Sequence, residues 1–197
     1  DTFRHVYQNR HQYAKEWKQK TGHKVVGYLC TYVPEEILYA GDVLPVRIMG
    51  SHEPPDIASP YIFDMFCPFC RDCLAQGLQG RYDYLDGITI AQSCLHMRQV
   101  FSSWQLHIPT AYSYYLYMPH GVHSPRAKPY LAGEMDDFKK SLEGWLGKTI
   151  STQDLDRAIQ VYNTNRQLMK QVYEMRKAKE PPITGTEAML MVLASQF

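Results

Sequence analysis

Short apolar segments alternate with helical segments through the first two thirds of the chain, and this alternation limits its possible folds more than any other feature. The patterns predict buried strands over residues 24–30, 44–49, 88–94 and 112–118. The first of these is continuously apolar, as expected for a strand covered on both faces. Helices are expected between them, over 34–40, 67–78 and 98–105. Strands and helices that alternate at this spacing predict an α/β fold with a doubly wound, mostly parallel sheet and flanking helices.

The remaining segments are helical in pattern. Helices are expected over residues 1–20, 139–146, 154–179 and 188–197. The last three make a helical C-terminal part, with apolar residues at helical spacing. We therefore divide the chain into a Rossmann-like α/β domain over residues 1–130 and a helical extension over residues 131–197. We expect the extension to lead to a second domain that is not present in this chain.

Charge and hydropathy exclude several classes of protein. Twenty-one Lys and Arg face twenty Asp and Glu among 197 residues, which leaves a formal net charge of +1. This balance gives no electrostatic basis for binding nucleic acid or an anionic membrane. No segment approaches the roughly 18 apolar residues of a membrane span, and the first residues lack the pattern of a signal peptide. We expect a soluble, cytoplasmic protein that binds neither nucleic acid nor membrane.

The five cysteines stand at positions 30, 67, 70, 73 and 94. An odd number, with three close together, is typical of a metal site rather than of a disulfide scaffold. Cys30 ends the first expected strand, Cys94 ends the third, and Cys67 opens the helix between the second and the third. Because residues beyond the carboxyl ends of parallel strands converge on one crevice, these three thiols should meet there. For each cysteine taken singly, the alternative is a small buried hydrophobic residue.

The run Cys-Pro-Phe-Cys-Arg-Asp-Cys over residues 67–73 does not make a complete site by itself. A structural zinc ion requires four ligands, and bacterial ferredoxins have a fourth cysteine followed by proline. On a straight helix, Cys67, Cys70 and Cys73 drift around the axis and do not cap one cluster together. We expect Cys67 to bind with remote partners, while Cys70 and Cys73 pack or lie behind the ligands.

Three histidines near a proline-rich loop, expected over residues 119–129, offer a weaker metal site. They are His107, His120 and His123. The His-Gly-Val-His pair has zinc-binding residue types, but two ligands do not complete a zinc site.

Several segments together resemble the subunits of benzoyl-CoA reductases and 2-hydroxyacyl-CoA dehydratases. They are residues 27–40, 44–47, 67–71, 84–88 and 93–94, with Arg98 and Trp104. The resemblance covers about residues 24–105. Within this family, the Leu-Pro-Val-Arg-Ile-Met-Gly and Cys-Leu-His-Met-Arg-Gln stretches are most similar to the ATP-dependent benzoyl-CoA reductases of anaerobic aromatic degradation.

The resemblance implies a 4Fe-4S cluster bound by Cys30, Cys67 and Cys94, with benzoyl-CoA or another acyl-CoA nearby. It also implies three kinds of partner: a homologous iron-sulfur subunit, ATP-hydrolysing activator subunits, and ferredoxin as the electron donor. The expected activity is that of an oxidoreductase acting on CH-CH groups, which reduces benzoyl-CoA to a cyclohexadiene carboxyl-CoA. Two alternatives stay open: a subunit of a 2-hydroxyacyl-CoA dehydratase, and a non-catalytic electron-relay subunit of the same complex.

The chain also departs from the family pattern. Cys30 matches a position kept mainly among the dehydratases, and Leu95 stands where the family often has Asp. Cys70 and Cys73 are additional to the usual cysteines. Family members continue into a second domain of comparable size, so we expect this chain to be part of a longer protein.

Four further residues are candidates by position. His96 and Tyr32 stand two residues beyond Cys94 and Cys30, and we expect them to donate protons to the substrate. Orientation of the ligands, or plain packing, is the alternative for both. Arg47 and Arg98 are expected to bind the CoA phosphates or to neutralise the cluster, with solvated surface arginines as the alternative.

Overall fold

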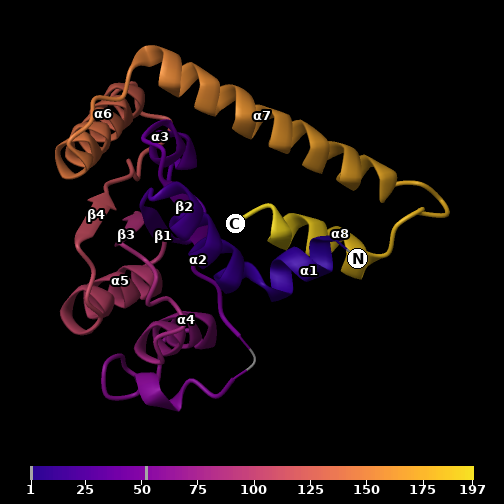
Figure 1. The fold of residues 1–197 in the computed structure, drawn as a ribbon, viewed down its shortest axis with the longest axis horizontal. Coiled ribbons are helices and arrows are strands. Elements are labelled where there is room, and N and C mark those ends of the chain that lie inside the picture. The colour runs from indigo at the N-terminus through magenta and orange to yellow at the C-terminus, as the bar shows by residue number, and fades with distance from the viewer. Residues whose placement is uncertain (1, 52) are drawn as a thin grey trace.

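The structure is a computed structural model that describes residues 2–51 and 53–197, and these residues form one sheet and eight α-helices (Figure 1). The strands are β1 (Val25–Leu29), β2 (Leu44–Arg47), β3 (Gly87–Ala91) and β4 (Tyr112–Leu116). The helices are α1 (Thr2–Gln8), α2 (Arg10–Thr21), α3 (Glu35–Ala40), α4 (Pro68–Leu78), α5 (Leu95–His107), α6 (Ala127–Leu146), α7 (Thr152–Met175) and α8 (Gly185–Ala194), with a 3-10 turn η1 at Asp56–Ala58. None of the helices in these residues is long and apolar enough to cross a membrane.

The strands are all parallel and lie in the order β2-β1-β3-β4. In the centre, Gly27 of β1 pairs with Val46 of β2 on one side and with Ile88 of β3 on the other. Every residue of β1 and β3 is buried, which explains their continuously apolar sequences, whereas the edge strand β4 is buried only at its two ends. The prediction of an α/β fold with a parallel sheet is confirmed.

Helices cover both faces of the sheet. In Figure 1, α4 and α5 lie below the sheet, and α3 and α6 lie above it. The lower core contains Leu74 and Trp104, and the upper core contains Leu38, Phe138 and Leu142. The chain passes from β1 to β2 through α3 and then returns to β3 through α4 on the opposite face. The strand order therefore reverses between β1 and β3, and this switch point is where α/β sheets bind their ligands.

Helix α6 begins earlier than the sequence predicts, at Ala127 instead of residue 139. The prediction assigned Pro129 to a loop. In the structure, Pro129 lies in the first helical turn, where a proline breaks no intrahelical hydrogen bond because the N–H groups there have no partner in the helix. The helix therefore crosses residue 130 and contributes Phe138 to the upper core. The division of the chain at residue 130, and a second domain beyond the extension, stay predictions.

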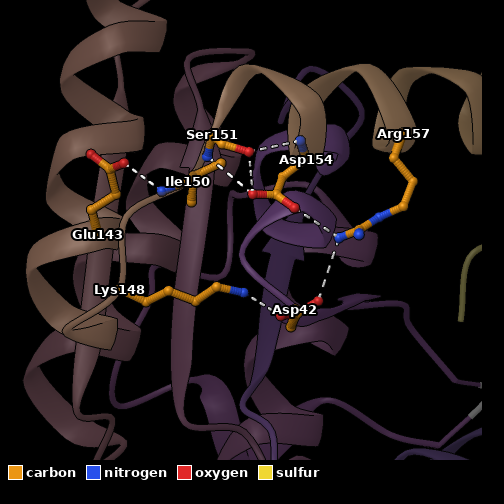
Figure 2. Close-up of polar contacts among 7 residues, drawn as sticks. All are labelled: Asp42, Glu143, Lys148, Ile150, Ser151, Asp154 and Arg157. Atoms are coloured by element: carbon orange, nitrogen blue, oxygen red, sulfur yellow. Dashed lines mark hydrogen bonds and ion pairs between the residues drawn. The ribbon is translucent and has the colours of Figure 1, made fainter.

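The turn between α6 and α7 is held by side-chain caps, which Figure 2 shows. Glu143 accepts a hydrogen bond from the backbone N–H of Ile150 at 2.6 Å. Ser151 and Asp154 form a capping box at the start of α7, with Ser151 Oγ accepting from the Asp154 N–H at 3.2 Å. These bonds satisfy helix-end groups that would otherwise lack partners.

Asp42, in the turn after α3, connects this junction to the sheet (Figure 2). Its backbone is left-handed, with φ at 59°, and its carboxylate pairs with Lys148 and, at 3.7 Å, with Arg157. Because α3 also packs along α7, the helical C-terminal part is attached to the α/β part through α3 and its following turn.

Candidate functional site

Three cysteines occupy the switch point at the carboxyl side of the sheet. Cys30 directly follows β1, and Cys94, three residues after β3, is the N-cap of α5. Cys67 is the N-cap of α4, which packs against α5 on the same face of the sheet. Each of these cysteines thus stands where a strand ends or a helix begins, and their convergence on one ligand stays a prediction.

Cys67, Cys70 and His96 offer ligand atoms that all lie within 4.8 Å of one another. Cys70 is only 2% exposed, whereas Cys67 is half-buried. Burial raises the pKa of Cys70 to about 12, and the charges of Cys67 and Cys94, with hydrogen bonding to the same two sulfurs, act in the same direction. Cys70 is therefore a protonated thiol that interacts with the sulfurs of Cys67 and Cys94. The sequence analysis expects it only to pack or to lie behind the ligands.

Cys67 and Cys94, which is outside the group within 4.8 Å, lie at helix N-termini. The pKa of Cys67 is lowered chiefly by the backbone N–H of Cys70, an effect that burial opposes and the N–H of Phe69 reinforces. The sulfur of Cys94 accepts a hydrogen bond from the N–H of Met97 at 3.4 Å. Backbone donors and the positive end of a helix dipole stabilise thiolates, which are the form that binds metals.

His96 lies beside these thiols and holds the start of α4. Its Nδ1 accepts a hydrogen bond from the backbone N–H of Cys67 at 3.0 Å, and its ring meets Phe66 edge-on at 4.8 Å. A neutral imidazole has one nitrogen that accepts and one that donates, so the proton of His96 is on Nε2. Because Nδ1 is already engaged, the thiols are better metal ligands here than this ring.

Cys30 has an unusual backbone. Its φ is 66°, in the left-handed region, which costs a residue other than glycine roughly 1–2 kcal/mol. Such strain clusters at functional sites. Its half-buried side chain packs against the lower core, in which Cys67 is also partly buried, but it lies outside the group within 4.8 Å.

Two other predicted residues lie at the surface of this edge. Tyr32 is 57% exposed, in the segment between β1 and α3. Arg98 is exposed on the first turns of α5, with its guanidinium 5.9 Å from the ring centre of Tyr115. Both side chains are accessible to a bound molecule.

Arg47 contacts the end of the chain. Its guanidinium donates to Oε1 of Gln196 at 3.0 Å, and its backbone N–H donates to the Gln196 carbonyl at 3.2 Å. Its Nε is buried without a hydrogen-bond partner among the described residues. The segment after α8 therefore covers the edge strand β2. The two residues in contact are 149 positions apart in the sequence.

The histidines of the alternative zinc site lie apart from any complete ligand group. His120 pairs with Gln92 at 2.7 Å, beside a surface hollow of about 550 Å³ at the end of β4. His107 lies against the ring of Tyr61, with centroids 4.7 Å apart. Within residues 2–51 and 53–197, no group of three possible metal ligands includes these histidines or His123.

Large apolar side chains are exposed around the thiols, a feature that the sequence analysis missed. Phe63 and Met65, in the segment before α4, are 74% and 84% exposed, and Leu95, next to Cys94, is 66% exposed. Phe69 lies between Cys67 and Cys70 in sequence and is also exposed. Exposed apolar side chains close together mark contact sites for partners or ligands. The sequence feature that could have indicated them is the presence of large apolar residues within a few positions of Cys67 and Cys94.

The donor set fits an iron-sulfur cluster. Thiols from separate elements of the fold are gathered at one edge, and soft thiolate ligands favour iron-sulfur clusters over hard cations. The sulfurs of Cys67 and Cys94 both accept hydrogen bonds from backbone N–H groups at helix N-termini.

Comparisons with known proteins agree with the resemblance that the sequence carries. The family model described as "2-hydroxyglutaryl-CoA dehydratase, D-component" matches residues 30–197. One subunit of the benzoyl-CoA reductase of Thauera aromatica is 29% identical over 184 residues, which are 92% of this chain and 48% of that protein. The (R)-phenyllactyl-CoA dehydratase beta subunit of Clostridium sporogenes is 25% identical over 99% of this chain and 52% of its own length.

A third relative, the beta subunit of the (R)-2-hydroxyglutaryl-CoA dehydratase of Acidaminococcus fermentans, is 26% identical over 89% of this chain and 47% of that protein. The chain therefore spans about half the length of these curated relatives. Since the family model covers most of the sequence, the chain belongs to the family of the 2-hydroxyglutaryl-CoA dehydratase D-component, which includes subunits of acyl-CoA dehydratases and of a benzoyl-CoA reductase.

Proposed function

We propose that this chain is the iron-sulfur part of an ATP-dependent benzoyl-CoA reductase and that Cys30, Cys67 and Cys94 bind its 4Fe-4S cluster. The observation that carries the proposal is the position of these thiols around the switch point between β1 and β3. When bound, such a cluster supplies electrons of low potential for reduction of the aromatic thioester.

The neighbouring residues have separate roles in this proposal. Cys67 and Cys94, as helix N-caps, present thiolates to the cluster. Cys70 stays protonated because it is buried, and its single S–H donates to the sulfur of either Cys67 or Cys94. His96 holds the backbone at Cys67 through Nδ1 and presents its Nε2–H as a proton donor, and the exposed Tyr32 hydroxyl is a second donor.

Substrate and partners would bind at the same edge of the sheet. Exposed Arg98 is placed to pair with the CoA phosphates, with Arg47 as a further cation at the end of β2. The exposed Phe63, Met65 and Leu95 support the presence of an apolar covering, which a substrate or another protein of the complex would supply. The partners in this proposal are a homologous iron-sulfur subunit, ATP-hydrolysing activator subunits and ferredoxin.

A 2-hydroxyacyl-CoA dehydratase is the second candidate. The description of the matching family model and the names of two relatives support it. The position of Cys30 also supports it, since the resemblance relates this cysteine mainly to the dehydratases. An electron-relay subunit without substrate contact is a variant of either activity.

Iron and sulfide content test the cluster. Protein purified without oxygen should be brown and contain about four irons and four sulfides per chain. Replacing Cys67, Cys94 or Cys30 by Ser should remove most of this iron. Cys73→Ser is the matched control, because Cys73 lies on α4 with its side chain fully buried, and Cys70→Ser should also retain iron. Equal loss from all five variants would contradict the ligand assignment.

The reaction is tested with the complete complex. ATP-dependent consumption of benzoyl-CoA without oxygen supports the reductase, whereas consumption of a 2-hydroxyacyl-CoA supports the dehydratase. A crystal structure with bound acyl-CoA separates catalysis from relay, since an acyl group beyond contact with this chain's cluster leaves only the relay.

A further inference from the structure

Cys67 and Cys70 form a pair of thiols at the start of α4. Cys67 is the N-cap, Pro68 is the first helical residue, and Cys70 completes the first turn. Residues three apart on a helix are neighbours on one face. Their sulfur atoms lie within 4.8 Å of each other, so an S–S bond of about 2.05 Å requires the side chains to rotate toward one another.

The two thiols differ in access. Cys67 is half-buried, so a small molecule in solution reaches it, whereas Cys70 is 2% exposed and is reached through Cys67. Cys73 lies one turn further along, fully buried, with its sulfur 3.9 Å from the carbonyl of Ile48. An accessible cysteine at a helix start, with a buried one three residues later, is the arrangement of dithiols that exchange with other disulfides.

We propose that Cys67 and Cys70 form a reversible disulfide when no cluster is bound, with a low-molecular-weight disulfide such as oxidised glutathione as the oxidant. The Cys67 thiolate attacks one sulfur of the small disulfide, forms a mixed disulfide and releases one thiol. Cys70 then loses its proton, attacks the Cys67 sulfur and displaces the second thiol. The two cysteines lose two electrons and two protons, and the small disulfide becomes two thiols.

The disulfide would have a consequence for the proposed cluster. A sulfur engaged in a disulfide is not a thiolate, so the bond and the cluster exclude each other at Cys67. This consequence rests on the proposed function, whereas formation of the disulfide does not. Exposure of the iron-free site to an oxidant would therefore prevent cluster binding until the disulfide is reduced.

Peptide mapping tests the bond directly. The full chain, stripped of iron without oxygen, is titrated with oxidised glutathione, unfolded in an alkylating reagent and cut with trypsin. Cleavage after arginine places Cys67 and Cys70 together in residues 48–71, and Cys30, Cys73 and Cys94 in three other peptides. We expect peptide 48–71 to be unalkylated and two hydrogens lighter than the dithiol form, while the other three are alkylated.

Other products would overturn the proposal. These are a peptide 48–71 with two alkyl groups, the same peptide with a persistent glutathione adduct, or a link to peptide 82–98. The variant Cys70→Ser should stop at a glutathione adduct on Cys67, whereas the control Cys73→Ser should form the disulfide like the original chain. A Cys70→Ser variant that lost two hydrogens within the peptide would also overturn the pairing.

Iron loading separates this proposal from the proposed function. The oxidised chain should take up little iron and sulfide until a dithiol reductant restores both thiols. If the reduced chain never takes up iron, the proposed function fails while the mapped disulfide stands. If the oxidised and reduced chains load equally, the competition at Cys67 is contradicted.

Discussion

The backbone N–H of Cys67 donates a hydrogen bond to Nδ1 of His96 at 3.0 Å. This bond connects the start of α4 to the first turn of α5, the two helices whose N-caps are Cys67 and Cys94. One ring thus holds the backbone of Cys67 with one nitrogen and has its proton on the other. The anchoring by His96 and its proposed role as a proton donor are therefore separable by mutation.

We predict that His96→Ala loses much of its bound iron, because the N–H of Cys67 loses its acceptor and the start of α4 is no longer fixed. Leaving a partly buried donor unpaired costs about 1–3 kcal/mol. Iron per chain after gel filtration without oxygen is the measurement.

The matched variant is His96→Asn, whose side-chain oxygen lies close to the position of Nδ1. It should retain iron while losing activity of the complex if Nε2–H is the proton donor. Full activity in His96→Asn would leave His96 with the anchoring role alone, and full iron in His96→Ala would contradict the anchor.

Gly77 sets how closely α4 approaches α5. A Cβ at this position would lie 2.6 Å from ring carbons of Trp104 and from Cδ1 of Ile108. We predict that Gly77→Ala lowers the free energy of unfolding by about 1–3 kcal/mol, as overpacking does in a dense core. Because α4 and α5 carry Cys67 and Cys94 at their N-caps, we expect iron retention to fall with it.

Gly133→Ala on α6 is the control, since a Cβ there meets no atom within 4 Å. It should raise stability by about 0.5–1 kcal/mol, the usual gain in a helix interior. Urea unfolding of both variants gives the comparison. Equal effects of the two substitutions would contradict the close packing of α4 on α5.

The sheet and the places of Cys30 and Cys94 after its strands were predictable because they follow from topology. A continuously apolar run such as Val25–Leu29 is stable in a sheet when both of its faces are covered, and the ends of such parallel strands share one edge. The position of Cys94 after β3 then follows from chain order. These inferences need no knowledge of which side chains touch.

The details of packing were not predictable in this way. Contact of Cys70 with Cys67 and Cys94 depends on how α4 meets α5, and the pairing of Arg47 with Gln196 joins residues that are 149 positions apart in the sequence. The left-handed backbone of Cys30 is a local departure that no residue pattern predicts, because few residues other than glycine adopt it. Pro129 misled the prediction because its effect depends on its place within the helix.

His11 predicts a pH dependence of stability. Its Nδ1 lies 3.1 Å from the hydroxyl of Tyr84, and its ring meets Tyr82 edge-on. Burial, followed by the charges of Arg10 and then Lys15, lowers the pKa of His11 from 6.5 to about 4. The unfolded chain therefore binds more protons between these pH values, and stability falls as the pH is lowered through this window.

We predict that His11→Gln loses less stability than the original chain between pH 7 and pH 4.5, by about 1–2 kcal/mol after allowance for the partial exposure of the ring. Carboxylates titrate equally in both proteins, so the difference isolates His11. Free energies of unfolding from urea titrations at the two pH values measure it. Parallel pH profiles would show that His11 titrates normally in the folded chain.

Anomalous X-ray scattering at the iron edge, from crystals grown without oxygen, tests the cluster most directly. The account predicts an iron peak at the carboxyl edge of the sheet, in contact with the sulfurs of Cys30, Cys67 and Cys94. Sulfurs of these three residues pointing into separate apolar surroundings, with no iron peak between them, would contradict it.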